Sequence, residues 1–354
     1  MKSFLKVIVL FLIFMVIAYS SPLINREDST ALFKSYDAKQ GNLKMKVDSK
    51  ETPIKYNEEK SIAQYIGKPF SLIEKKYGKP NRMYATPYEY DNYVYNKGQE
   101  GYLIVGVKAD KVVRFYVAGN EIPVSPFTID MPSDQVINRF DLQTEIMVES
   151  PIGKYQLSLA EDDLYSRPLL KVSKGIYAQL TMDATTHKLF SVSFMDSETL
   201  VKMRPYESVY DGDIYEPPKF SDKQWVNMNR GMSLDVEELT NLYREKEGLN
   251  PLKLDKNLTT EAELHSKDMY ENEFFNHESP DRGDLTTRLA HLNKNNVDEQ
   301  ENLAANYVDG IATFGAWLNS PNHLQKIRTE KANIMGVGGY RFYLTQIIVE
   351  EEQE

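Results

Sequence analysis

The stretch DKNLTTEAELHSKDMYENEFFNHESPDRG, residues 255–283, joins a well-marked helix to a polar turn. Asp255 is a suitable cap for the helix. Four side chains then recur at the spacing of one buried helical face: Leu258, Ala262, His265 and Met269. Because His265 lies on that face, we interpret it as a core histidine with a local hydrogen bond. His277 follows two phenylalanines and precedes a Ser-Pro turn, so its neighbours do not show whether its ring is core or site.

The segments around this stretch predict further helices and a closing pair of strands. Upstream, Asp235 and Glu238 match a capping box for a helix that ends at Gly248. Downstream, two helices and a hairpin are expected over residues 284–295, 309–327 and 332–350. The second of these helices is interrupted at Ser320, which can cap a new turn that begins at Pro321. Together these patterns predict helices enclosing a short antiparallel sheet.

Four motifs in this part of the chain, taken together, resemble the CAP superfamily, which contains cysteine-rich secretory proteins, antigen 5 and pathogenesis-related 1 proteins (the SCP fold). They are LYREKEGLNPLKLDKNLTTEAELHSKDMYENEFFNHESPDRG at 242–283, QENLAAN at 300–306, AWLNSPNHLQKI at 316–327, and NIMGVGGY with YLTQ at 333–346. Each motif alone is weak, but their order and separations are specific. The resemblance covers about Met232 to Val349 and implies an α-β-α sandwich with a cleft.

The resemblance also implies which side chains line the cleft. The family's histidine after paired aromatics and its Gly-Glu-Asn glutamate correspond to His277 and Glu301, and the histidine of the bacterial Ser-Pro-Gly-His motif corresponds to His323. Two further positions of the animal-type set differ, because Ser320 stands for a glutamate and Tyr343 for a histidine. The animal-type zinc set therefore does not carry over whole.

Two interpretations of this cleft stay open. His277, Glu301 and His323 supply two imidazoles and a carboxylate, which can hold a divalent metal such as zinc with one open position. Alternatively, Glu301 fixes the imidazole tautomers in a hydrogen-bonded cluster, with Tyr343 nearby. A hydrolase would need an activated water and a separate base, and no nucleophile elbow accompanies the histidines. Catalytic residues are therefore not assigned, and binding is expected rather than catalysis.

Residues 61–203 predict an α+β domain made of two similar units, at about 61–128 and 129–203, which arose by duplication or are alike by coincidence. Each unit opens with a short helix that has a proline in its first turn, Pro69 or Pro132, followed by strand-like runs. The arrangement resembles the CAP-associated domain that precedes CAP domains in exported bacterial proteins. The proline-containing segment 204–231 is expected to link it to the CAP domain at 232–350.

The fold class expected from both parts is α+β: a C-terminal α-β-α sandwich (CAP/SCP-like) preceded by a duplicated helix-plus-antiparallel-strand domain. One tyrosine-rich run in the first part allows two interpretations. It is either a sugar-binding face or ordinary packing within a sheet, since aromatic residues favour strands. The run contains Tyr84, Tyr88, Tyr90, Tyr93 and Tyr95.

The N-terminus indicates export. Lys2 and Lys6 precede an apolar run from Val7 to Ala18, and Ser20 offers a small-residue exit, which is typical of a secretory signal over residues 1–21. An uncleaved signal anchor is the alternative, and it would be the protein's sole attachment to a membrane. Residues 22–60 are polar and predict a flexible spacer. The chain has no cysteine, so disulfides and thiol catalysis are excluded.

Composition narrows the expected partners. The net charge of −10 argues against nucleic acid and against docking on an anionic membrane surface. The CAP resemblance implies small hydrophobic ligands or extracellular proteins as partners. The expected function is non-catalytic binding of one of these, or of a cell-wall component, at the cell surface. The alternatives are a metal-dependent hydrolase acting on a cell-envelope polymer or peptide, and a structural role in which the tyrosine-rich domain grips glycan.

Overall fold

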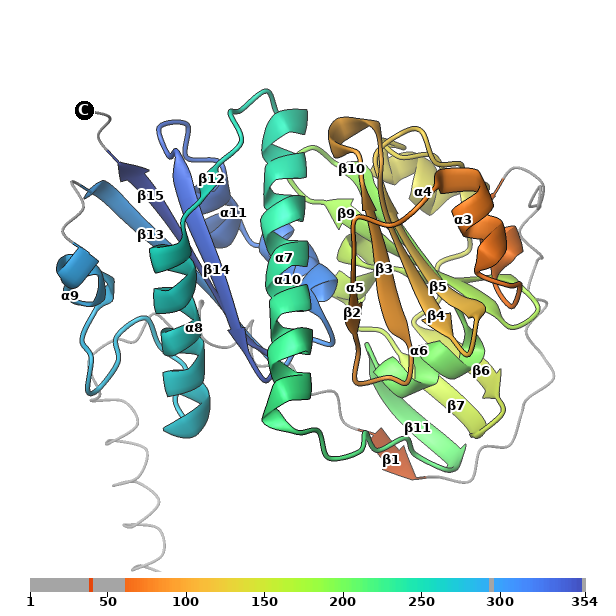
Figure 1. The fold of residues 1–354 in the computed structure, drawn as a ribbon. Helices are drawn as coiled ribbons and strands as arrows, with labels where there is room; N and C mark the ends of the chain where they lie inside the picture. Colours follow the sequence, from red (N-terminus) through yellow and green to blue (C-terminus); the bar gives the residue numbers. More distant parts are fainter. Residues whose placement is uncertain (1–37, 41–60, 293–295, 352–354) are drawn as a thin grey trace, which may run out of the picture.

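The computed structural model describes residues 38–40, 61–292 and 296–351. Figure 1 shows two sheet-containing halves on either side of one long helix, α7 (Asp222–Lys246). Helices and mostly antiparallel sheets occur in both halves, which confirms the predicted α+β class. The predicted signal or anchor segment, residues 1–21, lies outside the described residues. Within the ranges described, no helix has the length and apolar character needed to span a bilayer.

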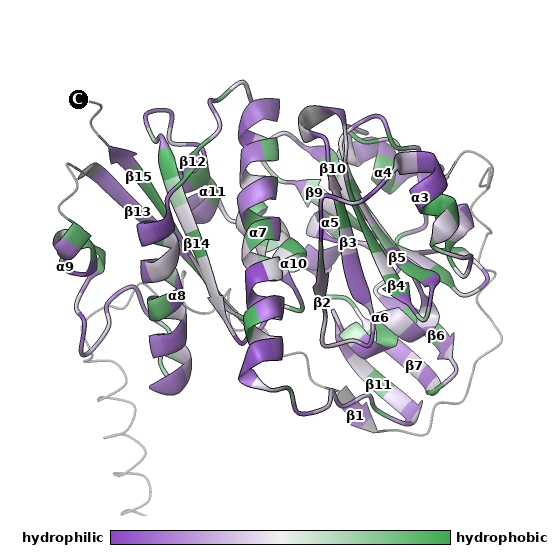
Figure 2. Cartoon of the chain, in the orientation of Figure 1, coloured by the Kyte–Doolittle hydropathy of each residue, from purple (hydrophilic) through white to green (hydrophobic). Residues whose placement is uncertain are grey.

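The N-terminal half is built on a seven-stranded antiparallel sheet. In sheet order its strands are β2 (Arg82–Ala85), β3 (Asp91–Asn96), β4 (Tyr102–Lys108), β5 (Lys111–Ala118), β10 (Lys188–Asp196), β9 (Ile176–Asp183) and β8 (Leu169–Ser173). A smaller sheet runs β1 (Ala38–Gln40), β11 (Glu207–Gly212), β7 (Gly153–Ser158) and β6 (Glu145–Ser150). Figure 2 shows β4 and β5 as hydrophobic along most of their length, because both faces of these central strands are buried.

The two predicted units repeat each other where their helices meet the sheet. Pro69, just before α3 (Ser71–Tyr77), bridges to Lys111 at the start of β5. In the same way Pro132, just before α4 (Ser133–Arg139), bridges to Lys188 at the start of β10. Strands β5 and β10 pair with each other at the centre of the sheet. The two units therefore share this helix-to-strand contact, and their origin by duplication stays a prediction. Two further helices, α5 (Glu161–Ser166) and α6 (Ser197–Met203), belong to the second unit.

The predicted spacer and linker both contain regular structure. Strand β1 falls inside the predicted spacer 22–60. It pairs in parallel with β11 of the smaller sheet. Strand β11 and the first turns of α7 fall inside the predicted linker 204–231. The linker therefore continues the fold of both halves instead of separating them.

Helix α7 also begins earlier than its predicted capping box. Ser221 and Gln224 form the box at the observed start of the helix. Asp235 and Glu238, which were predicted to cap it, lie well inside the helix, where both bind Arg82 of β2 at 2.6 Å. Their carboxylates serve the contact between the halves and not a helix end.

The C-terminal half is an α-β-α sandwich. Its sheet runs β12 (Lys253–Leu254), β14 (Ile334–Tyr340), β15 (Tyr343–Glu351) and β13 (Asn296–Ala305). Helices α8 (Lys256–Glu271) and α9 (Leu285–Leu289) pack on one face, whereas α7, α10 (Gly310–Leu318) and α11 (Pro321–Ile327) pack on the other. Asp255 caps α8 as predicted. The helix is interrupted between α10 and α11 at the predicted Ser320-Pro321 position.

One of the large hydrophobic cores crosses from one half to the other. It joins side chains of the seven-stranded sheet, α7 and α10: Tyr84, Tyr102, Tyr116, Phe190, Val236, Leu239, Tyr243, Phe314 and Trp317. In the tyrosine-rich run, four rings are buried and the fifth, Tyr93, packs against Phe70. The packing interpretation is confirmed and the sugar-binding face is wrong, because these rings have no exposed common surface.

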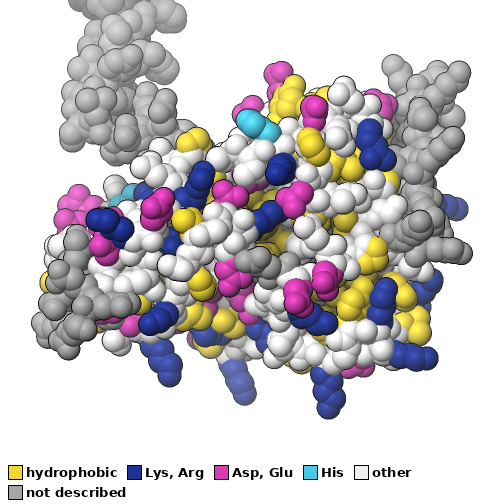
Figure 3. Space-filling model, turned by 90° about the horizontal axis from the view of Figure 1, so that it is seen from above, with side chains coloured by type: hydrophobic (Ala, Val, Ile, Leu, Met, Phe, Trp, Pro, Cys, Tyr) yellow, Lys and Arg dark blue, Asp and Glu magenta, His cyan; other side chains and the backbone are white. Residues whose placement is uncertain are grey.

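On the face shown in Figure 3, Lys and Arg side chains are interspersed with Asp and Glu.

Candidate functional site

Glu301 lies on β13 and faces α8 and α9. It pairs across the sheet with Ile347, and cross-strand partners point to the same face. Ile347 packs with Leu258 of α8 and Leu289 of α9, which identifies that face. The Glu301 carboxylate is consequently covered by both helices, and the residue is only 4% exposed.

Both oxygens of this carboxylate have close partners. His277 Nδ1 lies 2.8 Å from Oε2, and Arg288 Nη2 lies 2.8 Å from Oε1. Burial acts to raise the pKa of Glu301, but the hydrogen bond from His277 and the charge of Arg288 prevail and lower it. Glu301 is therefore ionised at neutral pH and held on both sides.

His277 is the accessible member of this group. Its side chain is 46% exposed, whereas those of Glu301 and Arg288 are 2% and 0% exposed. Because an ionised carboxylate only accepts hydrogen bonds, His277 Nδ1 carries the hydrogen of this contact, and Nε2 is the ring nitrogen left for another molecule. The arrangement thus presents one imidazole nitrogen in a fixed orientation at the surface.

His265 lies directly behind this pair. It is fully buried, its Nε2 donates to the Asn276 carbonyl at 3.0 Å, and the same nitrogen lies 3.9 Å from Glu301 Oε2. Burial lowers the pKa of His265 to about 4, so the ring is neutral. The predicted core histidine is confirmed, but it also supports the loop that carries His277.

The sequence did not reveal the cations behind the site. Arg288 is completely buried in α9 and donates both to Glu301 and to the His277 carbonyl. Its neighbour Glu261, also buried, binds Arg282 at 2.6 Å. The one signal available was an arginine inside a leucine-spaced helix, and such residues usually face solvent.

His323 does not join this group, contrary to the prediction. The next residue on β13, Asn302, points to the opposite face from Glu301, and its side chain donates to the His323 carbonyl. The His323 ring stacks on Trp317 and bonds Ser320 Oγ at 2.7 Å, on the side of the sheet covered by α7 and α11. Glu301 and Asn302 are adjacent in their motif but point to opposite faces of β13. His323, which binds Asn302, therefore lies on the other side of the sheet from Glu301.

Tyr343 shares a face with Glu301 but lies further along the sheet. It pairs with Ala305, which is four residues after Glu301 on β13. The Tyr343 ring contacts Tyr270 and Phe275. It borders the site as an aromatic neighbour and has no polar contact with Glu301 among the described residues.

The tentative metal set of His277, Glu301 and His323 does not fit a bound zinc ion. In the described part of the chain, no three His, Cys, Asp or Glu side chains converge as metal ligands. Zinc needs three or four such donors, and the Arg288 cation beside Glu301 would repel a second cation there. The geometry matches a hydrogen-bonded cluster.

Comparisons with known proteins match both halves of the chain. A family model described as CAP-associated N-terminal matches residues 66–206, and the model of the cysteine-rich secretory protein family matches residues 237–345. Uncharacterized membrane protein YlbC of Bacillus subtilis (strain 168) is 36% identical over 285 residues, which are 80% of this chain and 82% of that protein. Uncharacterized protein YkwD of the same organism is 33% identical over 103 residues, 29% of this chain and 40% of that protein.

Two solved structures share the two-part fold. One is the crystal structure of an extracellular protein containing a SCP domain from Bacillus anthracis str. Ames, with a TM-score of 0.78 and 31% identity. It covers 87% of this chain and 100% of that one. The other is a cysteine-rich secretory protein from Staphylococcus aureus, with a TM-score of 0.74 and 26% identity, covering 89% and 100%.

Proposed function

The chain belongs to the cysteine-rich secretory protein (CAP) family, as a CAP domain preceded by a CAP-associated domain, and we propose that it is a non-catalytic binding protein of the bacterial cell surface. In this proposal it engages a ligand or partner in the cell envelope through the region around His277. The bound molecule is held and not chemically converted.

Export is supported by the N-terminal sequence and by the relatives. Residues 1–21 have the basic start, apolar run and small-residue exit of a secretory signal or anchor. One relative bears the name of a membrane protein, and one structural neighbour is described as extracellular. We therefore propose a location outside the cytoplasmic membrane, either released or held by the N-terminal segment.

One observation carries the binding proposal: an exposed imidazole is held in place by a buried carboxylate. Each Glu301 oxygen accepts a hydrogen bond at 2.8 Å and the side chain is 2% exposed, so Glu301 does not itself reach a molecule at the surface. What the site offers to another molecule is His277 itself, oriented from behind. Preorganised, partly exposed side chains of this kind suit recognition.

The alternative, a metal-dependent hydrolase, has less support. It needs a metal-bound water, and the donor set does not fit a metal, as shown above. The serine hydroxyls nearest to His277 in sequence are also engaged. Ser279 Oγ donates to Asp268 at 2.6 Å, and Ser266 Oγ donates to the Gly338 carbonyl at 2.9 Å. Neither serine is paired with His277 as a nucleophile would be.

Sedimentation with isolated cell envelope tests this proposal. The full-length chain should pellet with the envelope in a saturable way, and His277→Ala should weaken the apparent affinity about tenfold, because a central recognition side chain is lost. His291→Ala is the matched control. His291 is an exposed histidine in the 3-10 helix Ala290–Leu292 that follows α9.

Two outcomes contradict the proposal. One is equal envelope binding by the wild type and His277→Ala. The other is a steady release of soluble envelope fragments by the wild type that Glu301→Gln abolishes, which would establish turnover.

A further inference from the structure

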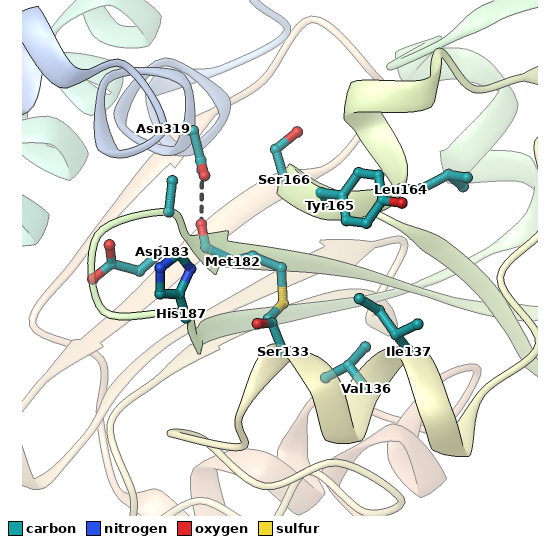
Figure 4. A pocket seen from close by; sticks show the side chains of 11 residues that line it. Ser133, Val136, Ile137, Leu164, Tyr165, Ser166, Met182, Asp183, His187 and Asn319 are labelled. Atoms are coloured by element: carbon teal, nitrogen blue, oxygen red, sulfur yellow. Dashed lines mark hydrogen bonds between the residues drawn. The ribbon is translucent and has the colours of Figure 1, made fainter.

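Two pockets adjoin where the N-terminal half meets α10, and His277 lines neither of them. The larger, about 400 Å³, lies between the seven-stranded sheet, α5 and α10. The smaller, about 340 Å³, lies between α4, α5 and the β9–β10 turn (Figure 4). Ser166 and Asn319 line both pockets, so the two are compartments of one groove.

The floor of the larger compartment is polar, whereas a fully packed interface between the two halves would be apolar. Alternation along β5, β9 and β10 turns the following side chains toward α10: Arg114, Tyr116, Gln179, Thr181 and Ser193. The intervening residues of the same strands, such as Phe115, Leu180 and Phe194, form the apolar core on the other face. Arg114 donates to Ser193 Oγ and Gln179 donates to Tyr206 Oη, so the floor is a hydrogen-bonded polar surface that suits a ligand with polar groups.

Helix α10 covers this floor incompletely. Beside Ile311, the side chains that it turns to the hollow are small, Ala312, Gly315 and Ala316, and each is partly exposed. The helix comes near the floor at Gly315, where an added Cβ would lie 3.3 Å from Thr181. Elsewhere the same helix buries Phe314 and Trp317 in the shared core. The space between α10 and the sheet therefore results from residue size on one face of the helix.

The buried charges in the larger compartment are paired, and the remaining charged lining residue, Asp162, is exposed. Arg114 binds Asp309 at 2.6 Å, and Arg167 binds Asp163 at 2.7 Å. A cation already neutralised by a carboxylate gives little attraction to a phosphate or another anion. The compartment therefore suits an uncharged ligand with hydrogen-bonding groups.

Two side-chain amides define what that ligand must offer. Asn319 Nδ2 donates to the Met182 carbonyl at 2.7 Å, the contact drawn in Figure 4, and also to the Gly315 carbonyl at 2.9 Å. Gln179 Nε2 donates to Tyr206 Oη at 2.7 Å. Neither Asn319 Oδ1 nor Gln179 Oε1 accepts a hydrogen bond from the described residues, so both amide oxygens are left to accept N–H or O–H donors.

The smaller compartment is apolar and open. Val136 and Ile137 of α4 face Leu164 and Tyr165 of α5 across it, with Met182 between them (Figure 4). Ile137 is 45% exposed and Tyr165 is 60% exposed, unusual values for such side chains at the mouth of a pocket. The wall is mainly aliphatic, which fits an aliphatic side chain better than the stacked face of a sugar ring.

We propose that this groove binds a short, extended, uncharged peptide segment. One large aliphatic side chain enters the compartment of Val136, Ile137 and Leu164. The peptide N–H groups donate to the carbonyl oxygens of Gln179 and Asn319. A peptide supplies both kinds of contact at the spacing of two adjoining compartments, and peptide recognition commonly combines backbone hydrogen bonds with a side-chain pocket.

The test is selection from a phage-displayed library of random heptapeptides on the full-length chain, followed by fluorescence anisotropy with individual peptides. Enriched peptides should carry Leu, Ile, Val or Met with few charges. Ile137→Asp and Ala316→Leu, one in each compartment, should each weaken binding at least tenfold. Both positions are partly exposed in the fold, so the variants should remain folded.

Two controls make the result specific. Leu72→Asp changes an exposed apolar residue of α3, the counterpart of α4 in the first unit, and should stay within twofold of the wild type. His277→Ala should also stay within twofold, which separates this groove from the site of the proposed function. The proposal is overturned if no peptide is enriched, if the groove variants bind the peptides like the wild type, or if chitin oligosaccharides bind in place of peptides and lose binding in the same variants.

Discussion

Arg288 helps to keep the Glu301 carboxylate ionised, since its guanidinium lies 2.8 Å from Oε1 and both side chains are at most 2% exposed. Removing one partner of a buried ion pair leaves the other charge uncompensated, at a cost of ~3–5 kcal/mol. Arg288→Met should lower the free energy of unfolding by about that amount in urea denaturation. Adding Glu301→Gln to this variant should restore part of the loss. A double variant no more stable than Arg288→Met alone would rule out the charge explanation.

Glu237 in α7 gives the protein a dependence on pH. Its carboxylate is 1% exposed, with the nearest cation, Arg230, 4.0 Å away, and burial raises its pKa from 4.5 to about 7. Between these values the folded chain keeps a proton that the unfolded chain releases, so stability falls as pH rises from about 4.5 to 7. Asp235, with a pKa raised to about 6 by burial, acts in the same direction.

Glu237→Gln should therefore be more stable than the wild type at pH 8, by ~1–3 kcal/mol, and nearly equal to it at pH 4. Urea denaturation at the two pH values measures the difference. A variant that loses stability equally at both would show that the carboxylate makes contacts that the amide cannot replace.

The sequence identified His277 and Glu301 because both sit in motifs with fixed neighbours. It did not identify Arg288, which binds Glu301 from α9, 13 residues earlier in the chain. Nor could it assign His323 to a side of the sheet. Whether Glu301 or Asn302 faces α8 depends on the pairing of β13 with β15, which no local pattern records.

At the scale of elements, the contact of α8 with β14 depends on glycine. A Cβ added to Gly338 would lie 2.0 Å from the Glu263 backbone nitrogen and 2.5 Å from the Ala262 carbonyl carbon. Gly338→Ala must therefore push α8 away from the sheet, and it should cost ~2–3 kcal/mol in thermal or urea unfolding. Gly101→Ala is the matched control, since its Cβ would meet only Ile122 at 3.4 Å. Equal effects of the two substitutions would refute this explanation.

Element prediction succeeded where a local signal was complete. Asp255 capped α8, and the Ser320-Pro321 break separated α10 from α11. The start of α7 was missed because its first turns are polar and follow Pro217 and Pro218. Those turns are helical because Met228 is buried and Met232 packs in the core shared by the two halves, which is tertiary information.

At the scale of the molecule, the two halves form one folding unit. Tyr84 of β2 hydrogen-bonds Asp235 of α7, and Arg82 binds the same carboxylate. The shared core surrounds these contacts. Calorimetry of the full-length chain should show one unfolding transition for both halves. Two separated transitions would mean that the interface between the halves contributes little to the stability of either half.

Gly231 permits this close approach. A Cβ there would lie 2.2 Å from the Tyr84 ring, so Gly231→Ala must shift α7 away from β2. We expect the single transition to move to lower temperature, corresponding to ~1–3 kcal/mol. The sequence predicted two domains with a linker between them. It held no sign of this interface, because the residues that form it lie far apart along the chain.

The most direct test of the central claim, that His277 serves binding and not metal chemistry, is envelope binding by the full-length chain with and without EDTA. Our account predicts the same affinity in both conditions, a loss of about tenfold in His277→Ala, and no soluble fragments released by the wild type. Binding that EDTA removes and zinc restores, or fragment release that depends on Glu301, would contradict it.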